Sequence, residues 1–202
     1  MVTWDVIKLK KTVHEIDGTN LAKIKLLPQM THCRLRSEVI FLKGEVYVMA
    51  CGKSNAPVEK YSPLTKTWNE VADKFDGRVN FCACAFMDKI YMFGGSWCTN
   101  ITNSCLQFDT TKENRLDEFW KETSVMTVER RHAACVVFQG NIVVSGGDNI
   151  YNDLSSVESY DVYSNKWSPM PRMINVQSNH SLVNVKDKLF VIGHGENRCE
   201  IF

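Results

Sequence analysis

The feature that most constrains the fold of this chain is a pair of adjacent glycines that closes an apolar run and recurs along the sequence. Gly94-Gly95 and Gly146-Gly147 each follow a short run rich in Val, Ile, Tyr, Met or Phe. An imperfect copy ends at Cys51-Gly52, and a later copy ends at Gly193-His194-Gly195. The second glycines of these copies stand 43, 52 and 48 residues apart. A period of this length indicates a repeat architecture in which each copy forms one structural unit.

Each diglycine is followed by an aromatic residue in a β-prone stretch and then by a tryptophan. Large flat side chains that occur once per unit suit packing between neighbouring sheets. Glycine permits a backbone conformation that a Cβ atom would oppose. We therefore expect all of these landmarks to be structural. The glycines are Gly52, Gly94, Gly95, Gly146 and Gly147, the aromatics are Tyr61, Phe108 and Tyr160, and the tryptophans are Trp68, Trp120 and Trp167.

A second β-prone stretch precedes each apolar run, and a tight turn such as Lys43-Gly44 or Gln139-Gly140 joins the two stretches. The stretch with the aromatic landmark and the stretch with the tryptophan add two more strands. Four short antiparallel strands per unit describe one blade of a β-propeller. The sequence therefore predicts an all-β fold, and no segment competes as a helix.

The order diglycine, tyrosine-aspartate, tryptophan resembles the kelch motif, in particular the C-terminal propeller of kelch-like adaptor proteins, in which BTB and BACK domains precede the propeller. The resemblance covers roughly residues 13–202 and implies a partial kelch β-propeller with about three complete four-stranded blades and two partial ones. The expected boundaries within 1–202 are a partial blade at 1–34, blades at 35–77, 78–129 and 130–177, and a partial blade at 178–202.

The chain opens and closes in the middle of a blade, which favours a fragment of a larger propeller, because propellers close with about four to eight blades. The alternative keeps the chain intact. In that case the C-terminal hairpin pairs with the N-terminal strands and completes the fourth blade of an unusually small ring.

Charge and cysteine pattern exclude several classes of function. The chain has 24 basic and 23 acidic residues, so no electrostatic drive toward nucleic acid or a membrane surface is expected. No stretch has the length of a signal-peptide core or a membrane helix, and a cytoplasmic location is expected. The eight cysteines form no Cys-x-x-Cys, so neither a metal nor another cofactor is expected. We expect buried reduced thiols, with Cys82 and Cys84 facing the same side of a strand, and Cys98 as the candidate for a reactive thiol.

No catalytic arrangement is recognisable, and the chain is expected not to be an enzyme. Its five histidines are scattered, and no serine lies in a Gly-x-Ser-x-Gly elbow. Some kelch-type propellers are copper oxidases, but that chemistry needs a cysteine-tyrosine crosslink with further tyrosine and histidine ligands, a set that this sequence does not offer.

Binding is therefore expected at one rim of the propeller, where loops are free of scaffold demands. Counting back seventeen residues from each second glycine gives the residue that leads into each blade: Leu35, Arg78, Arg130 and Ser178. The resemblance implies that such arginines grip acidic or carboxylate-bearing peptide segments, a task that suits a guanidinium fork. Exposed aromatics in the loops after the diglycine would add anchors. The predicted partner-binding residues are Arg78 and Arg130 at this entry position, Arg36, Arg131 and Asn179 directly after it, and Trp97, Asn100, Asn149 and Tyr151 in the loops.

The resemblance implies that the propeller recognises a protein substrate or peptide segment for a cullin-RING ubiquitin ligase. Cullin would be reached only through a BTB domain, which this chain does not contain. The alternative partner class is actin, as in cytoskeletal kelch proteins.

Overall fold

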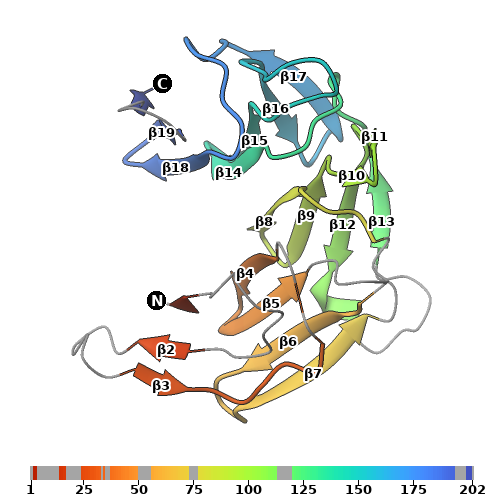
Figure 1. Ribbon diagram of the computed structural model, residues 1–202, viewed down its shortest axis with the longest axis vertical. Coiled ribbons are helices and arrows are strands. Elements are labelled where there is room, and N and C mark those ends of the chain that lie inside the picture. Colours follow the sequence, from red (N-terminus) through yellow and green to blue (C-terminus); the bar gives the residue numbers. More distant parts are fainter. Residues whose placement is uncertain are drawn as a thin grey trace. The chain divides into compact units, whose positions relative to one another are not determined.

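The computed structural model describes residues 2–3, 14–16, 24–32, 34, 37–49, 56–72, 77–112, 120–193 and 199–201. The chain divides into two compact units, Met1–Gly77 and Arg78–Phe202. Within the described residues both units are built of antiparallel strands, with a single 3₁₀ turn, η1, at Thr110–Lys112 (Figure 1). No helix in this part of the chain has the length and hydropathy needed to cross a membrane.

The first unit contains one complete four-stranded sheet and one three-stranded sheet. The complete sheet consists of β4 (Glu38–Leu42), β5 (Glu45–Met49), β6 (Val58–Ser62) and β7 (Thr67–Ala72), each paired with the next in sequence. The smaller sheet consists of β1 (Val2–Thr3), β2 (His14–Ile16) and β3 (Ile24–Leu26). Lys43 and Gly44 both have positive φ, which explains the tight turn between β4 and β5.

The second unit contains two complete sheets, a three-stranded sheet and a small hairpin. The first complete sheet has β8 (Cys82–Phe86), β9 (Lys89–Phe93), β12 (Cys105–Asp109) and β13 (Trp120–Thr123), with the hairpin β10 (Ser96–Trp97) and β11 (Asn100–Ile101) between β9 and β12. The second has β14 (Ala134–Phe138), β15 (Asn141–Ser145), β16 (Val157–Asp161) and β17 (Lys166–Met170). The last has β18 (Ser181–Val185), β19 (Lys188–Ile192) and β20 (Cys199–Ile201).

In each three- or four-stranded sheet the strands pair in sequence order, as in a propeller blade, and within the second unit β14 contacts both β8 and β18, the first strands of its neighbouring sheets (Figure 1). The predicted all-β propeller fold with four-stranded blades is confirmed: three sheets are complete and two have three described strands.

Apolar side chains fill the space between successive blades of the second unit. On one side of β14–β17, Tyr160 and Trp167 meet Phe93 of β9, with ring centroids 6.2 and 5.5 Å from that of Phe93. The Trp167 indole donates to the carbonyl of Ser124, at the end of the preceding blade, over 2.8 Å. On the other side, Ala134, Val143, Val157 and Met173 pack against Leu182, Leu189 and Val191 of the next sheet. The aromatic landmarks of this blade therefore lie in an inter-blade core.

The first glycine of each diglycine allows one blade to touch the lead-in residue of the next. A Cβ on Gly94 would lie 2.2 Å from the Arg130 carbonyl oxygen, and one on Gly146 would lie 2.4 Å from that of Gln177. The second glycines, Gly95 and Gly147, donate their N–H groups to these same two carbonyls over 2.8 Å. Both glycines of each pair have positive φ. The diglycine thus clamps the start of the following blade.

The strand ends correct the register of the first and last copies. Gly94 and Gly146 directly follow β9 and β15, whereas β5 ends at Met49 and β19 at Ile192. The diglycine places in these two copies are therefore 50–51 and 193–194, one residue earlier than the sequence pattern indicated. Gly52 itself lies outside the described residues. The predicted register was one residue late in these two copies because it was counted from a glycine that does not hold the same place in every copy.

Candidate functional site

The corrected register shows that one position recurs four residues before the first strand of each blade. We call it the lead-in position. It is occupied by Arg34, Arg78, Arg130 and Gln177. Arg34 and Gln177 were missed by the count that gave Leu35 and Ser178. The division between the two units falls between Gly77 and Arg78, where the sequence predicted a blade boundary.

Arg130 lies inside its blade and has no exposed surface. Its guanidinium donates to the carbonyls of Gly146 and Ser156 over 2.7 and 3.1 Å. It also forms an ion pair with the buried carboxylate of Glu158 over 2.6 Å. These bonds tie the lead-in segment to the diglycine and to the third strand, so Arg130 acts as a structural residue within the blade.

Arg34 repeats this arrangement in the first unit. It is buried and donates to the Pro57 carbonyl and, over 2.8 Å, to Glu59. Burial by itself would raise the pKa of Glu59, but hydrogen bonds from Arg34 and from the Thr31 N–H outweigh it and hold that pKa below its ordinary value.

A glutamate two residues before the aromatic landmark holds the segment that enters its blade. Glu59 accepts from the Thr31 N–H over 2.6 Å, and Glu158 accepts from the Thr127 N–H over 2.8 Å. Glu200 accepts from the N–H groups of Ile174 and Asn175, each over 2.8 Å. The recurring Glu-x-aromatic pattern of Glu59, Glu158 and Glu200 was readable in the sequence and was missed.

Arg78 is also buried, with 2% of its surface exposed, but its surroundings differ. It donates to the carbonyls of Gly94 and Ser104 over 3.0 and 3.2 Å. Leu106 occupies the place that Glu158 holds in the next blade, and the Arg78 guanidinium lies 4.6 Å from the centre of the Trp97 ring. Arg78 and Arg130 were expected to bind a partner at the surface. Their burial does not agree with that role, because both guanidinium groups donate hydrogen bonds to backbone carbonyls of their own blades.

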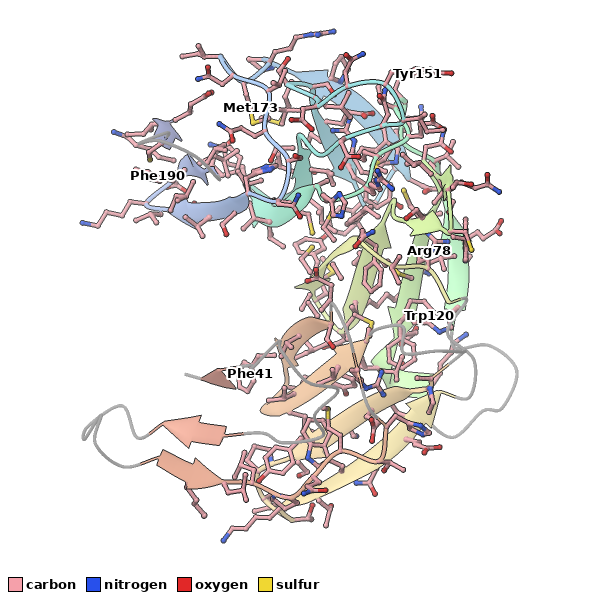
Figure 2. All side chains as sticks on the ribbon, viewed as in Figure 1. Phe41, Arg78, Trp120, Tyr151, Met173 and Phe190 are labelled. Atoms are coloured by element: carbon pink, nitrogen blue, oxygen red, sulfur yellow. The ribbon has the colours of Figure 1, made fainter. Side chains whose placement is uncertain are left out.

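The surface of this rim is formed instead by the loops after the diglycine. Trp97 lies in the β10–β11 hairpin with 36% of its surface exposed, and Asn100 in the same hairpin is exposed. Tyr151 is 80% exposed and projects from its loop (Figure 2), and Ile150 beside it is 62% exposed. Two large exposed apolar side chains therefore stand together at the tip of the second loop.

The loop that carries Tyr151 is held in a defined shape. The Asn149 side-chain oxygen accepts from the N–H groups of Tyr151 and Asn152, each over 2.9 Å. At its base, Asp148 exchanges two backbone hydrogen bonds with Arg131. The half-buried Asn149 is therefore a loop-shaping residue, and the aromatic anchor is presented by a rigid turn.

Arg131, directly after the buried Arg130, reaches the rim. Its Nε atom donates to Asp148 over 2.8 Å, and the other oxygen of Asp148 lies 2.6 Å from Nδ1 of His132. All three side chains are partly exposed. They form a charged group at the foot of the Tyr151 loop.

Backbone bonds bring the lead-in segments of successive blades together. The His132 N–H donates to the Asn80 carbonyl over 2.8 Å, and the Asn179 N–H donates to the His132 carbonyl over 2.9 Å. Asn179 is exposed. Because the loops after β9 and β15 end at the same edge of the sheets where β8, β14 and β18 begin, Trp97, Asn100, Arg131, Tyr151 and Asn179 share one end of the second unit. Arg36 lies outside the described residues.

The described residues contain no group of three or more His, Cys, Asp or Glu side chains placed to hold a metal ion. Their cysteines are free thiols. Burial raises the pKa of Cys105 to about 12, which keeps its thiol protonated. The chemistry that this end of the unit offers is contact through aromatic, amide and guanidinium groups.

Comparison with known proteins agrees with this architecture. Residues 129–174 match the Kelch motif family. Kelch-like protein 25 of Xenopus tropicalis is 29% identical over 145 residues, covering 71% of this chain and 24% of that protein. Human Kelch-like protein 6 is 27% identical over 198 residues, covering 92% of this chain and 30% of that protein. The chain thus spans between a quarter and a third of the length of these relatives. The solved structure of YjhT superposes with a TM-score of 0.75 at 15% identity, over 90% of this chain and 66% of YjhT, which shows a shared fold.

Proposed function

Since this chain is a kelch-repeat β-propeller that resembles the C-terminal propeller of kelch-like proteins, we propose that it is a non-enzymatic protein-binding module. The proposed binding surface is the end of the second unit that carries Trp97, Asn100, Arg131, Tyr151 and Asn179. We refer to these five residues as the loop rim.

The observation that carries this proposal is the exposure of Ile150 and Tyr151 on a turn whose Tyr151 and Asn152 N–H groups are held by the Asn149 side chain. A large apolar side chain on a rigid turn loses little conformational freedom when it binds, so it makes an efficient anchor. Trp97, which stacks on a buried arginine, offers a second anchor of the same type.

The charges of the loop rim also bear on the partner. The deep arginines Arg78 and Arg130 are engaged within their blades, so they do not contribute the acid-gripping surface that the sequence suggested. Arg131 is paired with Asp148. We therefore propose a partner segment that binds through an apolar or aromatic side chain, with Arg131 and the exposed amides fixing its register.

We propose further that the partner is a substrate delivered to a cullin-RING ubiquitin ligase in the cytoplasm. The support is the similarity to Kelch-like proteins 25 and 6 together with the resemblance of the repeat to adaptor propellers. In that role the chain supplies recognition only, and a BTB domain would supply the link to cullin.

The test is quantitative capture of partner proteins from cell extract by the wild-type chain and by two variants. Trp97→Ala with Tyr151→Ala removes both anchors. Tyr163→Ala is the matched control, because Tyr163 is 77% exposed in the turn between β16 and β17, at the opposite end of the same sheet. We expect at least one specific partner to fall about tenfold or more with the double variant and to stay unchanged with the control. Equal recovery by all three proteins would contradict the proposed surface.

The ligase role has its own readout. If the captured partner is a ligase substrate, inhibiting cullin activation will raise its cellular abundance and remove its ubiquitin conjugates. Co-sedimentation of the chain with purified filamentous actin, at a strength unaffected by the Trp97 and Tyr151 changes, would favour the cytoskeletal alternative.

A further inference from the structure

Three cysteines occupy facing positions on the first strands of two neighbouring blades. Cys82 and Cys84 lie on β8, and Cys135 lies on β14. These two strands contact each other, and all three side chains belong to one apolar cluster between the blades. Residues two apart on a strand point to the same side, so Cys82 and Cys84 both face β14. The three thiols are free.

The register of β8 against β14 is fixed by one backbone hydrogen bond at the start of both strands. The His132 N–H donates to the Asn80 carbonyl over 2.8 Å. Cys82 and Cys84 follow Asn80 by two and four residues, whereas Cys135 follows His132 by three. Because Asn80 and His132 each precede their strand by two residues and both strands then advance about 3.3 Å per residue, Cys135 lies at a level between those of Cys82 and Cys84.

The Cys135 side chain packs in the same apolar cluster as Cys82 and Cys84. Interaction with these two thiols, together with burial, raises the pKa of Cys135 well above its ordinary value. A protonated thiol is a poor nucleophile. Cys135 is therefore expected to react slowly with alkylating reagents while remaining within reach of a neighbouring sulfur.

Burial separates the two possible partners of Cys135. Cys82 is 4% exposed, and its thiol points at the Phe93 carbonyl of its own blade, with a sulfur to oxygen distance of 3.9 Å. Cys84 and Cys135 are both only half-buried. Cys84 is therefore the more exposed of the two cysteines beside Cys135, which favours it over Cys82 as the partner.

We propose that Cys84 and Cys135 are a redox pair that closes to a disulfide between the two blades when a low-molecular-weight disulfide is present. The Cys84 thiolate attacks one sulfur of that disulfide and releases one small thiolate. The Cys135 thiolate then attacks the Cys84 sulfur of the mixed disulfide and releases the second. Two electrons pass to the reagent, and the two thiol protons end on the two released thiols.

The bond would join the blade that carries Trp97 to the blade that carries Tyr151, at the strands where both blades begin. It would restrain the relative movement of these blades whether or not the loop rim binds a partner. The proposal therefore stands independently of the proposed function.

The test is equilibration of the full chain, with Cys98→Ser and Cys199→Ser removing two exposed thiols, in glutathione buffers from fully reduced to fully oxidised. Differential alkylation and peptide mapping report the state of each remaining cysteine. We expect a peptide pair linked through Cys84 and Cys135, with the loss of two titratable thiols. We also expect a rise of about 5 °C or more in the thermal midpoint of the oxidised protein.

Single changes separate the pair from its neighbour. Cys84→Ser and Cys135→Ser should each abolish the crosslink and the thermal shift, whereas Cys82→Ser should keep both. Cys84→Ala with a circular dichroism spectrum guards against misfolding of the serine variant. Failure to form the Cys84–Cys135 link in any buffer, while the wild-type chain becomes glutathionylated at the exposed Cys98, would overturn the proposal. A crosslink between Cys82 and Cys135 would overturn the assignment to Cys84.

Discussion

The blade that spans β8–β13 and the blade that spans β14–β17 hold the same lead-in arginine in different ways. Both Arg78 and Arg130 donate to a diglycine carbonyl and to the carbonyl before the third strand. Arg130 also forms an ion pair with the buried carboxylate of Glu158. In the β8–β13 blade Leu106 takes the place of that glutamate, and Arg78 lies against Trp97. The arginine-to-carbonyl bonds are thus common to these two blades, and the carboxylate is replaced in one of them.

The loops after the diglycine differ more than the scaffold beneath them. In the β8–β13 blade the chain forms the β10–β11 hairpin and exposes Trp97. In the β14–β17 blade it forms a turn held by Asn149 and exposes Tyr151. Both loops start from the same clamp on the next lead-in residue. The repeat therefore fixes where a loop begins, and each loop sequence then determines which side chain is presented.

The largest loss of unfolding free energy is expected when the lead-in arginine itself is replaced. Arg130→Met would leave the Glu158 carboxylate buried without its ion-pair partner, which costs about 3–5 kcal/mol of unfolding free energy. Arg78→Met removes two hydrogen bonds to carbonyls but leaves no unpaired carboxylate at position 106, where the residue is leucine. A loss of about 2 kcal/mol of unfolding free energy is expected. Urea unfolding of the two variants checks the difference. Equal losses would show that Glu158 gains nothing from Arg130.

A second effect concerns the clamp between blades. Gly94→Ala and Gly146→Ala each place a Cβ within 2.5 Å of a backbone carbonyl oxygen of the next blade. We expect a loss of about 3 kcal/mol for each, from steric overlap added to the cost of positive φ. Gly140→Ala is the matched control, because its φ is also positive but nothing lies within 4 Å, and about 1 kcal/mol is expected. Thermal or urea unfolding that ranks Gly140→Ala with the other two would contradict the clamp.

The first strand of the complete sheet in the first unit, β4, supplies a pH-dependent contrast. Glu38 begins β4, where Cys82 and Ala134 begin the equivalent strands, and burial raises the pKa of Glu38 from 4.5 to about 7. The folded chain therefore keeps a proton that the unfolded chain has lost, so this contribution to stability is complete below about pH 4.5 and disappears as pH rises through about 7. Glu38→Gln should flatten that slope and stabilise the chain at pH 8 by about 1–2 kcal/mol. The exposed Glu122→Gln is the control, and an unchanged slope in Glu38→Gln would refute the assignment.

The smallest stability effects are expected at the aromatic anchors. Trp97→Ala removes the ring that covers Arg78 and should cost about 0.5–1 kcal/mol. Tyr151→Ala, at an 80% exposed position, should change the unfolding free energy by less than about 0.5 kcal/mol. Differential scanning calorimetry checks both values. A larger loss at Tyr151 would mean that its ring is part of the scaffold and not an available anchor.

Much of the fold was predictable from sequence because its landmark residues recur at similar spacings. The diglycines, the tight turns such as Lys43-Gly44 and the aromatic landmarks mark each copy of the repeat, although the contacts that the diglycines and aromatics make are with neighbouring blades. The register of the first and last copies was not predictable in this way. Gly52 and Gly195 resemble the second glycine of the pair, but the ends of the preceding strands place that position one residue earlier. The recurring glutamates at 59, 158 and 200 were visible but carried no meaning until their backbone partners were seen.

The site was less predictable than the fold. From sequence, Arg78 and Arg130 look like exposed residues in a loop between blades. Their burial is explained only by the backbone carbonyls from other parts of the blade that accept their hydrogen bonds. The alternation of Cys82 and Cys84 was readable, but the approach of Cys135 depends on a hydrogen bond between blades. Trp97 and Tyr151 were identified correctly as exposed loop aromatics, because short polar loops after a diglycine have little apolar surface to cover them.

Site-specific photo-crosslinking tests the central claim, that the loop rim is the surface that contacts a partner, most directly. A photoreactive amino acid would be placed at position 97, 151 or 163, and the partner recovered most strongly by the wild-type chain would be irradiated with each protein. Crosslinks at 97 and 151 with none at 163 are predicted, since Tyr163 is as exposed as Tyr151 but lies at the other end of its sheet. Crosslinks at 163 with none at 97 or 151 would contradict the account.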